Sequence, residues 1–102
     1  MLLGKTIEGV WHTGLIINDV EYYYSGGICR DYKGNTPYGT PVKNLVIGAT
    51  KKTNAEFMAW ISSVSNEFTA EKYHLFYHNC NSFTNAAAIF LTGKGIPEYI
   101  TN

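Results

Sequence analysis

The chain has 102 residues, of which 45% are hydrophobic and 15% aromatic, enough apolar surface for one compact domain over residues 1–102. Eight Lys and Arg residues balance eight Asp and Glu residues, and the largest basic cluster is the pair Lys51-Lys52. This balance argues against nucleic acid as a partner. No apolar run approaches the ~18 residues of a membrane span.

The N-terminus, Met-Leu-Leu-Gly-Lys-Thr, is too short and too polar for a secretory signal. Without such a signal, Cys29 and Cys80 are expected to be two reduced thiols rather than a disulfide. We therefore expect a cytoplasmic or nuclear protein.

The first half of the chain predicts a β-hairpin. Residues 10–17 are rich in β-branched and aromatic side chains, Asn18-Asp19 can form a tight turn, and residues 20–24 read as the returning strand. Ser25-Gly26-Gly27 ends the hairpin. Residues 29–41, which hold two glycines and two prolines, predict a long turn-rich loop, and such loops are often functional.

A strand and a helix are predicted in the middle of the chain. Residues 42–49 favour a third strand, and Thr53 with Glu56 forms the pattern of a capping box for a helix over 54–67. Apolar residues follow at helical spacing and predict a core-facing stripe. They are Phe57, Trp60, Ile61, Val64 and Phe68.

The last third predicts a short strand over 73–77 and a helix from Cys80 to Leu91, with Gly93 as a terminator. The predicted order of elements is β-β-β-α-β-α, which indicates an α+β domain.

Cys80 lies in the polar stretch Tyr-His-Asn-Cys-Asn-Ser-Phe-Thr-Asn, at the predicted start of the last helix. Free amide hydrogens and the helix dipole there would lower the pKa of a thiol and could bind an oxyanion. Asn79 or Asn81 could cap the helix or assist as an oxyanion donor. The residues alone leave an activated Cys80 and an inert one open, because free cysteines are often quiet core residues. The polar neighbours favour an activated thiol outside the core, where its sulfur can meet a substrate.

Three histidines could serve such a thiol as a base. His12 lies in the middle of a predicted strand, on the same face as Gly14, whose small size would leave room for a partner. His78 is close to Cys80, although its plainer role is to shape the turn, and His74 is expected to be exposed.

Cys29, Cys80 and the histidines lack the spacing of a structural zinc site. We therefore expect no metal and no cofactor.

Two segments resemble a known family when they are taken together. Residues 4–28, with Trp-His-Thr-Gly, resemble the histidine segment of the PPPDE family of desumoylating isopeptidases. Residues 73–102, with His-Asn-Cys-Asn-Ser-Phe and Leu-Thr-Gly-Lys-Gly-Ile-Pro, resemble its cysteine segment. The match covers both ends of the chain in the family's order.

The resemblance implies a permuted papain-like cysteine-peptidase fold, with a small antiparallel sheet or barrel packed against helices. It also implies a Cys–His dyad that removes ubiquitin-like modifiers, SUMO or ubiquitin, from lysines of target proteins. By motif position, Cys80 is the nucleophile and His12 the general base, with His78 in a supporting role. A homodimer is implied as well.

The modifier's diglycine tail is slim and suits a narrow groove. We expect Trp11, Gly26, Gly27 and the 29–41 loop to line part of that groove. The plainer alternative is that the two glycines only terminate the hairpin.

The family carries a further strand before the Gly-Lys segment, whereas this chain begins at Met1 with almost nothing upstream. The domain is therefore expected to lack that strand. An unpaired edge beside the histidine strand would follow, exposed and prone to association.

Two other functions use the same residues. A protein S-acyl thioesterase, which removes fatty acyl chains, would keep the dyad and need an apolar tunnel beside Cys80. A non-catalytic binding module would keep modifier recognition while its dyad is misaligned.

Overall fold

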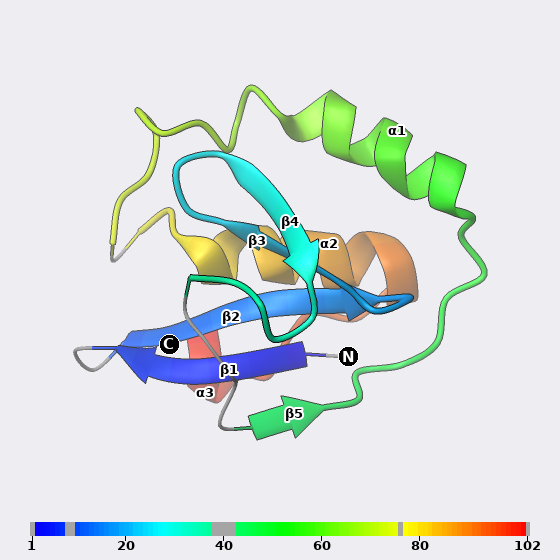
Figure 1. Cartoon of the computed structure of the whole chain (residues 1–102), viewed down its shortest axis with the longest axis horizontal. Helices are drawn as coiled ribbons and strands as arrows, with labels where there is room; N and C mark the ends of the chain where they lie inside the picture. Colours follow the sequence, from blue (N-terminus) through cyan, green and yellow to red (C-terminus); the bar gives the residue numbers. More distant parts are fainter. Residues whose placement is uncertain (1, 8–9, 38–42, 76, 102) are drawn as a thin grey trace.

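The computed structural model describes residues 2–7, 10–37, 43–75 and 77–101. These residues form an α+β domain whose strands precede its helices along the chain (Figure 1). In chain order the elements are β1 (Leu2–Ile7), β2 (Val10–Ile17), β3 (Val20–Tyr24), β4 (Ile28–Tyr32), β5 (Lys43–Leu45), α1 (Asn54–Val64), α2 (Cys80–Thr92) and α3 (Glu98–Thr101).

The strands form one antiparallel sheet in the order β4-β3-β2-β1-β5. The predicted hairpin is confirmed as β2 and β3, joined by Asn18 and Asp19 with φ of 49° and 68°. Asn and Asp tolerate this left-handed conformation, which matches the twist of the flanking strands. The hairpin places His12 on a central strand of the sheet.

The edge of β2 beside the histidine is not open. β1 pairs with β2 along its whole length, from Leu2↔Leu15 to Ile7↔Val10, and its other edge pairs with β5. The prediction of an exposed edge beside the histidine strand is therefore wrong. Residues Leu2–Ile7, which include the Gly-Lys segment itself, supply the main-chain hydrogen bonds that this edge needs. That the family's own N-terminal strand is absent stays a prediction.

The predicted loop over 29–41 is wrong in its first part, because β4 (Ile28–Tyr32) pairs with β3 from Val20↔Tyr32 to Tyr24↔Ile28. Gly27, with φ of +139°, turns the chain back in a conformation that other residues rarely adopt. The sequence predicts that Gly26 and Gly27 only end the hairpin, whereas in the structure they join the paired strands β3 and β4. Turns and bends follow β4 as far as Pro37, and residues 38–42 lie outside the described residues.

Two other strand predictions are also wrong in extent. The strand predicted over 42–49 is limited to β5, and the chain from 46 onward is irregular. None of the described residues in 73–77 belongs to a strand, since only a single bridge joins His74 to His78. Both segments are apolar enough to favour a strand. Beyond β5, however, they have no neighbouring strand with which to pair among the described residues.

The two long helices begin where the sequence indicates. Thr53 caps α1 in a complete capping box with Glu56, and the helix ends at Val64, before the predicted residue 67. Asn79 caps α2, and Gly93 ends it in a left-handed conformation with φ of 81°. No helix among the described residues has both the length and the apolar character to cross a bilayer.

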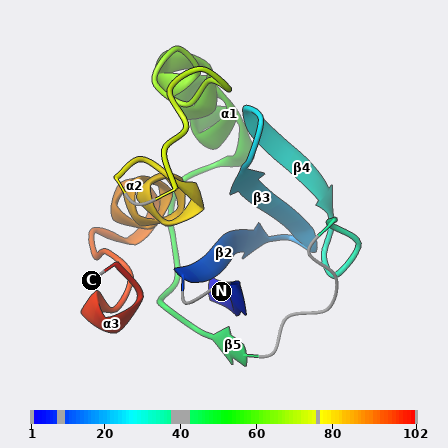
Figure 2. The same ribbon diagram turned by 90° about the vertical axis from the view of Figure 1, so that its left-hand side faces the viewer.

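All three helices lie on one face of the sheet (Figure 2). The core forms between them, where Leu15 of β2 and Tyr22 and Tyr24 of β3 meet α1 and α2. The predicted aromatic stripe of α1 packs into this core, with Phe57 1% exposed. Burial of these large side chains is the main source of the fold's stability.

The opposite face of the sheet carries buried polar side chains. Gly14 lies on this face, and a Cβ atom placed on it would be 2.9 Å from Oε2 of Glu21. The Glu21 side chain, itself 4% exposed, therefore occupies the space that we expected a partner of His12 to use. Its Oε1 accepts a hydrogen bond from the Gly34 amide at 3.2 Å.

We predict that Glu21→Gln stabilises the fold at neutral pH. Burial, and then the charge of Asp31, raises the pKa of Glu21 above its ordinary value of 4.5, against the Gly34 hydrogen bond. The folded state thus holds this proton more tightly than the unfolded state, so stability falls as the pH rises above about 4.5. Glutamine keeps the acceptor and removes the charge. The midpoint of thermal unfolding at pH 7 should rise by a few degrees, on the order of 2–4 °C.

The gain should disappear well below pH 4.5, where Glu21 is protonated in both states. Glu67→Gln, at an exposed position, is the control and should change little at either pH. A wild type at least as stable as Glu21→Gln at pH 7 would contradict the prediction.

Candidate active site

The site is built where β2 and β3 part. Their paired residues run from Ile17↔Val20 to Leu15↔Tyr22, after which β3 continues along β4 and β2 continues along β1. At the next positions of β2 the partner is a helix. The main-chain N–H of Thr13 donates to the sulfur of Cys80, and the Thr13 carbonyl accepts from Oγ1 of Thr84 at 3.3 Å.

Both main-chain groups of a strand residue point to the same side of the strand. Because β1 is paired with one side of β2, the first turn of α2 occupies the other side, which β3 has left. The thiol therefore lies against the main chain of the residue that follows His12. This is the arrangement by which the fold brings two distant segments together.

Asn81 fixes the start of α2 in this position. Its Oδ1 accepts a hydrogen bond from Oγ1 of Thr13 at 2.7 Å, and its Nδ2 donates to the carbonyl of Ile100 at 3.5 Å. The residue is 4% exposed, so these bonds are largely shielded from water. One side chain thus ties the histidine strand, the cysteine helix and α3 to one another.

Cys80 is the first residue of α2, as predicted, but it is not outside the core. Its side chain is 3% exposed, because the main chain of Thr13, the Asn81 side chain and the hydroxyl of Tyr73 surround the sulfur. The expectation of an accessible thiol is therefore wrong for this conformation. Polar neighbours in the sequence indicated solvent, whereas in the fold they turn inward and bond to the site itself.

The pKa of Cys80 also departs from our expectation. Burial raises the pKa of this thiol, and the hydrogen bonds to the sulfur from the amides of Thr13, Asn81 and Cys80 and from the Tyr73 hydroxyl offset only part of that effect. The donors expected at a helix start are thus present. Desolvation outweighs them, so the resting sulfur is a protonated thiol at neutral pH.

His12 directly precedes Thr13 in β2 and is 6% exposed. Its ring packs edge-to-face on the ring of Tyr23 in β3, with the centroids 6.2 Å apart and the planes at 75°. The Nε2 atom is buried. A buried histidine directly before the strand residue that bonds the thiol is a candidate base, and the surrounding side chains can fix its orientation. The side chain of Trp11, the preceding residue, lies outside the described side chains.

The other two histidines are placed differently. His78 stacks on Phe68 at 5.1 Å and 7°, and its Nε2 lies 2.6 Å from the carbonyl of Glu67. It therefore helps to hold the turn before α2. His74 is exposed, as expected, with its ring 4.8 Å from that of Tyr77.

Asn79 is committed to the helix cap. Its Oδ1 accepts from the amides of Asn81 and Ser82, and its Nδ2 donates to the carbonyl of Leu75 at 2.6 Å. This network joins the turn to α2 and sets the position of the residue that follows, which is Cys80.

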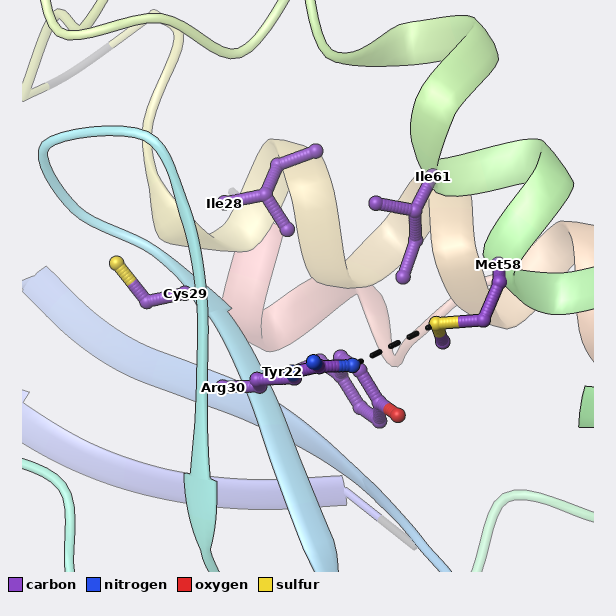
Figure 3. A pocket seen from close by; sticks show the side chains of 6 residues that line it. All are labelled: Tyr22, Ile28, Cys29, Arg30, Met58 and Ile61. Carbon is purple, nitrogen blue, oxygen red and sulfur yellow. Dashed lines mark hydrogen bonds between the residues drawn. The ribbon is translucent and has the colours of Figure 1, made fainter.

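Gly26 and Gly27 form the bend between β3 and β4, and a Cβ atom placed on either would meet nothing within 4 Å. A cavity of about 160 Å³ lies nearby, between β4 and α1. Figure 3 shows Ile28, Ile61 and Met58 converging on it, while Arg30 reaches the Met58 sulfur at 3.7 Å. Cys80 is not among the residues that line this cavity.

The described part of the chain contains no group of three or more His, Cys, Asp or Glu side chains arranged to hold a metal ion. The site that the structure does assemble is a thiol, an imidazole and the hydrogen-bond donors around the sulfur.

Sequence reasoning missed two of those donors. Thr13 was seen only as part of a motif, and Tyr73 only as the start of a strand. No spacing marks Tyr73 as a partner of Cys80, since a loop rather than a helix or strand joins them. The Trp-His-Thr-Gly motif did carry a signal for Thr13, because a threonine directly after the histidine can bond through both its main chain and its side chain.

We predict that Tyr73→Phe slows the reaction of Cys80 with iodoacetamide at neutral pH. The Tyr73 hydroxyl lowers the pKa of Cys80, so its removal reduces the thiolate fraction. The rate should fall by about threefold to tenfold, which corresponds to the ~1 kcal/mol of one ordinary hydrogen bond. Mass spectrometry of the modified peptides follows both thiols, with Cys29 as the reference in the same molecule.

Tyr22→Phe removes a hydroxyl from the adjacent core and should leave both rates unchanged. Equal slowing of Cys29 and Cys80 in Tyr73→Phe would indicate a general change in the fold and contradict the assignment.

Comparison with known proteins places this site in a family. Residues 1–102 match the family model described as "PPPDE putative peptidase domain". Desumoylating isopeptidase 1 of Xenopus laevis is 46% identical over 99% of this chain and 61% of its own length, and that of Homo sapiens is 42% identical over 100% and 62%. DeSI-like protein sdu1 of Schizosaccharomyces pombe is 31% identical over 90% of this chain and 50% of its own length.

The chain spans about three-fifths of the length of the two isopeptidases. The similarity covers the histidine strand and the cysteine helix together, in the same order along the chain. The chain belongs to the PPPDE peptidase family.

Proposed function

We propose that this protein is a cysteine isopeptidase that removes ubiquitin-like modifiers, SUMO or ubiquitin, from lysines of target proteins. One observation carries the proposal: the thiol at the start of α2 is hydrogen-bonded to the main chain of Thr13, directly after His12. A nucleophile and a base from opposite ends of the chain are thereby held in one buried site.

The relatives support the choice of reaction. Two of them bear the name desumoylating isopeptidase 1 and align with this chain over nearly all of its length. The order of the site along the chain, with the histidine strand before the cysteine helix, fits the permuted papain-like fold that we propose for the domain.

The proposed reaction begins with proton transfer. Since the resting sulfur is a thiol, His12 accepts its proton as the thiolate attacks the carbonyl carbon of the modifier's C-terminal glycine. The carbonyl π bond opens, and its oxygen carries the negative charge. The Cys80 amide is the proposed donor to that oxygen, since the Asn81 amide already donates to Oδ1 of Asn79.

Collapse of the tetrahedral intermediate expels the lysine amine, which takes the proton from the His12 imidazolium, and leaves a thioester on Cys80. His12 then accepts a proton from water as the water oxygen attacks the thioester. A second tetrahedral intermediate releases the modifier's carboxylate, and the sulfur recovers its proton. No cofactor is needed in this sequence.

The remaining predicted residues take supporting roles in the proposal. Asn79 and His78 hold the turn that presents Cys80, and Asn81 fixes α2 on β2. Trp11, Gly26 and Gly27 remain the proposed walls of the groove for the diglycine tail. A homodimer and a cytoplasmic or nuclear location belong to the proposal too.

We predict that SUMO or ubiquitin probes with a C-terminal thiol-reactive group label the wild type. Cys80→Ala should abolish labelling, because it removes the sulfur that forms the adduct. His12→Ala should reduce the labelling rate by about 10²-fold or more, as expected for loss of a general base. His74→Ala, at an exposed position, is the matched control, and its labelling rate per folded molecule should stay near that of the wild type.

Intact mass spectrometry measures the adduct, and circular dichroism confirms that each variant is folded. Labelling that persists in Cys80→Ala would refute the nucleophile. Folded wild type that neither probe labels would favour the two alternatives instead. Hydrolysis of a long-chain acyl thioester would then indicate a thioesterase, and binding of free SUMO without hydrolysis would indicate a binding module.

A further inference from the structure

We propose that Tyr23, held by Asp31, is the positioning residue of the base: it fixes the orientation of the His12 ring and favours its protonated form. The inference rests on the proposed isopeptidase function. It supplies the third group that the Cys–His pair lacks in the sequence, from a strand between the two motifs.

The geometry joins three strands. Tyr23 of β3 contacts His12 of β2 edge-to-face at 6.2 Å, on the face of the sheet that carries Glu21. The Tyr23 hydroxyl donates to Oδ2 of Asp31 in β4 at 2.6 Å. Tyr23 is 4% exposed and His12 6%, so the contact is shielded from water and neither ring can turn freely.

The hydrogen bond is short and its acceptor is a carboxylate, which places it among the stronger kinds. A tyrosine whose ring and hydroxyl are both held has one orientation. This fixed ring in turn restricts the orientation of the imidazole that packs on it. By contrast, Tyr22, the preceding residue, faces the helices and packs on Phe57 at 4.9 Å. The two neighbouring tyrosines thus serve opposite faces of the sheet.

The electrostatics favour an imidazolium. The Asp31 carboxylate, bonded to the Tyr23 hydroxyl, brings a full negative charge to the far side of the ring on which His12 packs. Burial, together with the bond to Asp31, raises the pKa of Tyr23, so the hydroxyl stays a donor at every working pH. An imidazolium is the form of His12 that donates its proton to the leaving lysine.

Other titratable groups surround this contact. On β4, Cys29 is directly opposite Tyr23, and on β3 Glu21 lies on the same face. On α2, the Cys80 sulfur is hydrogen-bonded to the amide of Thr13, the residue after His12. On β1, the main chain of Lys5 pairs with that of His12. The Tyr23 hydroxyl also lies within hydrogen-bond reach of the Cys29 sulfur, but Asp31 accepts from it at 2.6 Å and carries a full charge, which makes Asp31 the group to test.

The first test is an NMR titration of the histidine rings in the full-length wild type and in Tyr23→Phe and Asp31→Asn. Both variants should shift the titration midpoint of His12 to lower pH by about half a unit, the size of effect that a nearby buried charge produces. His74 and His78 are internal references and should not move. Tyr22→Phe, which removes a hydroxyl on the other face, should leave all three unchanged.

The second test is the pH dependence of kcat/KM for a SUMO conjugate. The acid limb, below which His12 is already protonated and cannot accept the thiol proton, should move to lower pH by the same amount in Tyr23→Phe and Asp31→Asn. The fall should lie mainly in kcat, since the groove for the tail is unaltered. A role in stability alone would lower the fraction of active enzyme at every pH without moving the limb.

The outcomes separate the two proposals. A wild type without turnover refutes the isopeptidase, while the NMR titration still decides the pairing of Tyr23 with His12. An unchanged His12 midpoint in both folded variants overturns the inference, whatever the activity. So does an equal shift of all three histidines, because that would reflect a change in the whole fold.

Discussion

The main chain of Thr13 is the constraint on which the site depends. A strand residue inside a sheet bonds to its neighbouring strand, but β3 diverges from β2 at this point, and buried main-chain groups without partners are costly. The start of α2 supplies those partners through the sulfur of Cys80 and the hydroxyl of Thr84. The need to satisfy a strand's hydrogen bonds thus brings the thiol to the histidine strand.

The same arrangement also raises the pKa of the Cys80 thiol. The contacts that fix Cys80 also remove it from water, and burial raises its pKa more than the surrounding donors lower it. A thiol of this kind depends on a base, since the helix start alone does not ionise it. The packing of His12 on Tyr23 therefore bears on the reaction as directly as the position of the sulfur.

Local signals in the sequence predicted those parts of the fold that are set by nearby residues. The Asn18-Asp19 turn, the Thr53–Glu56 capping box and the start of α2 at Cys80 are each determined within a few positions, and each is confirmed. Strand pairing was predicted poorly, even where the two strands are adjacent in the sequence. β1 was missed, β4 was taken for a loop, and the segment 73–77 was taken for a strand, because pairing is not visible in any one segment.

By itself the sequence determined the chemical groups of the site: one thiol at a helix start, one histidine in a strand, and a motif around each that marks the family. Only the tertiary structure decided the state of those groups. It buried the sulfur, committed Asn79 to capping and His78 to the preceding turn, and packed Tyr23, which is bonded to Asp31, on His12. The physical reason is that burial and hydrogen bonding across strands depend on which segments contact one another in the fold. The composition of a single segment does not determine those contacts.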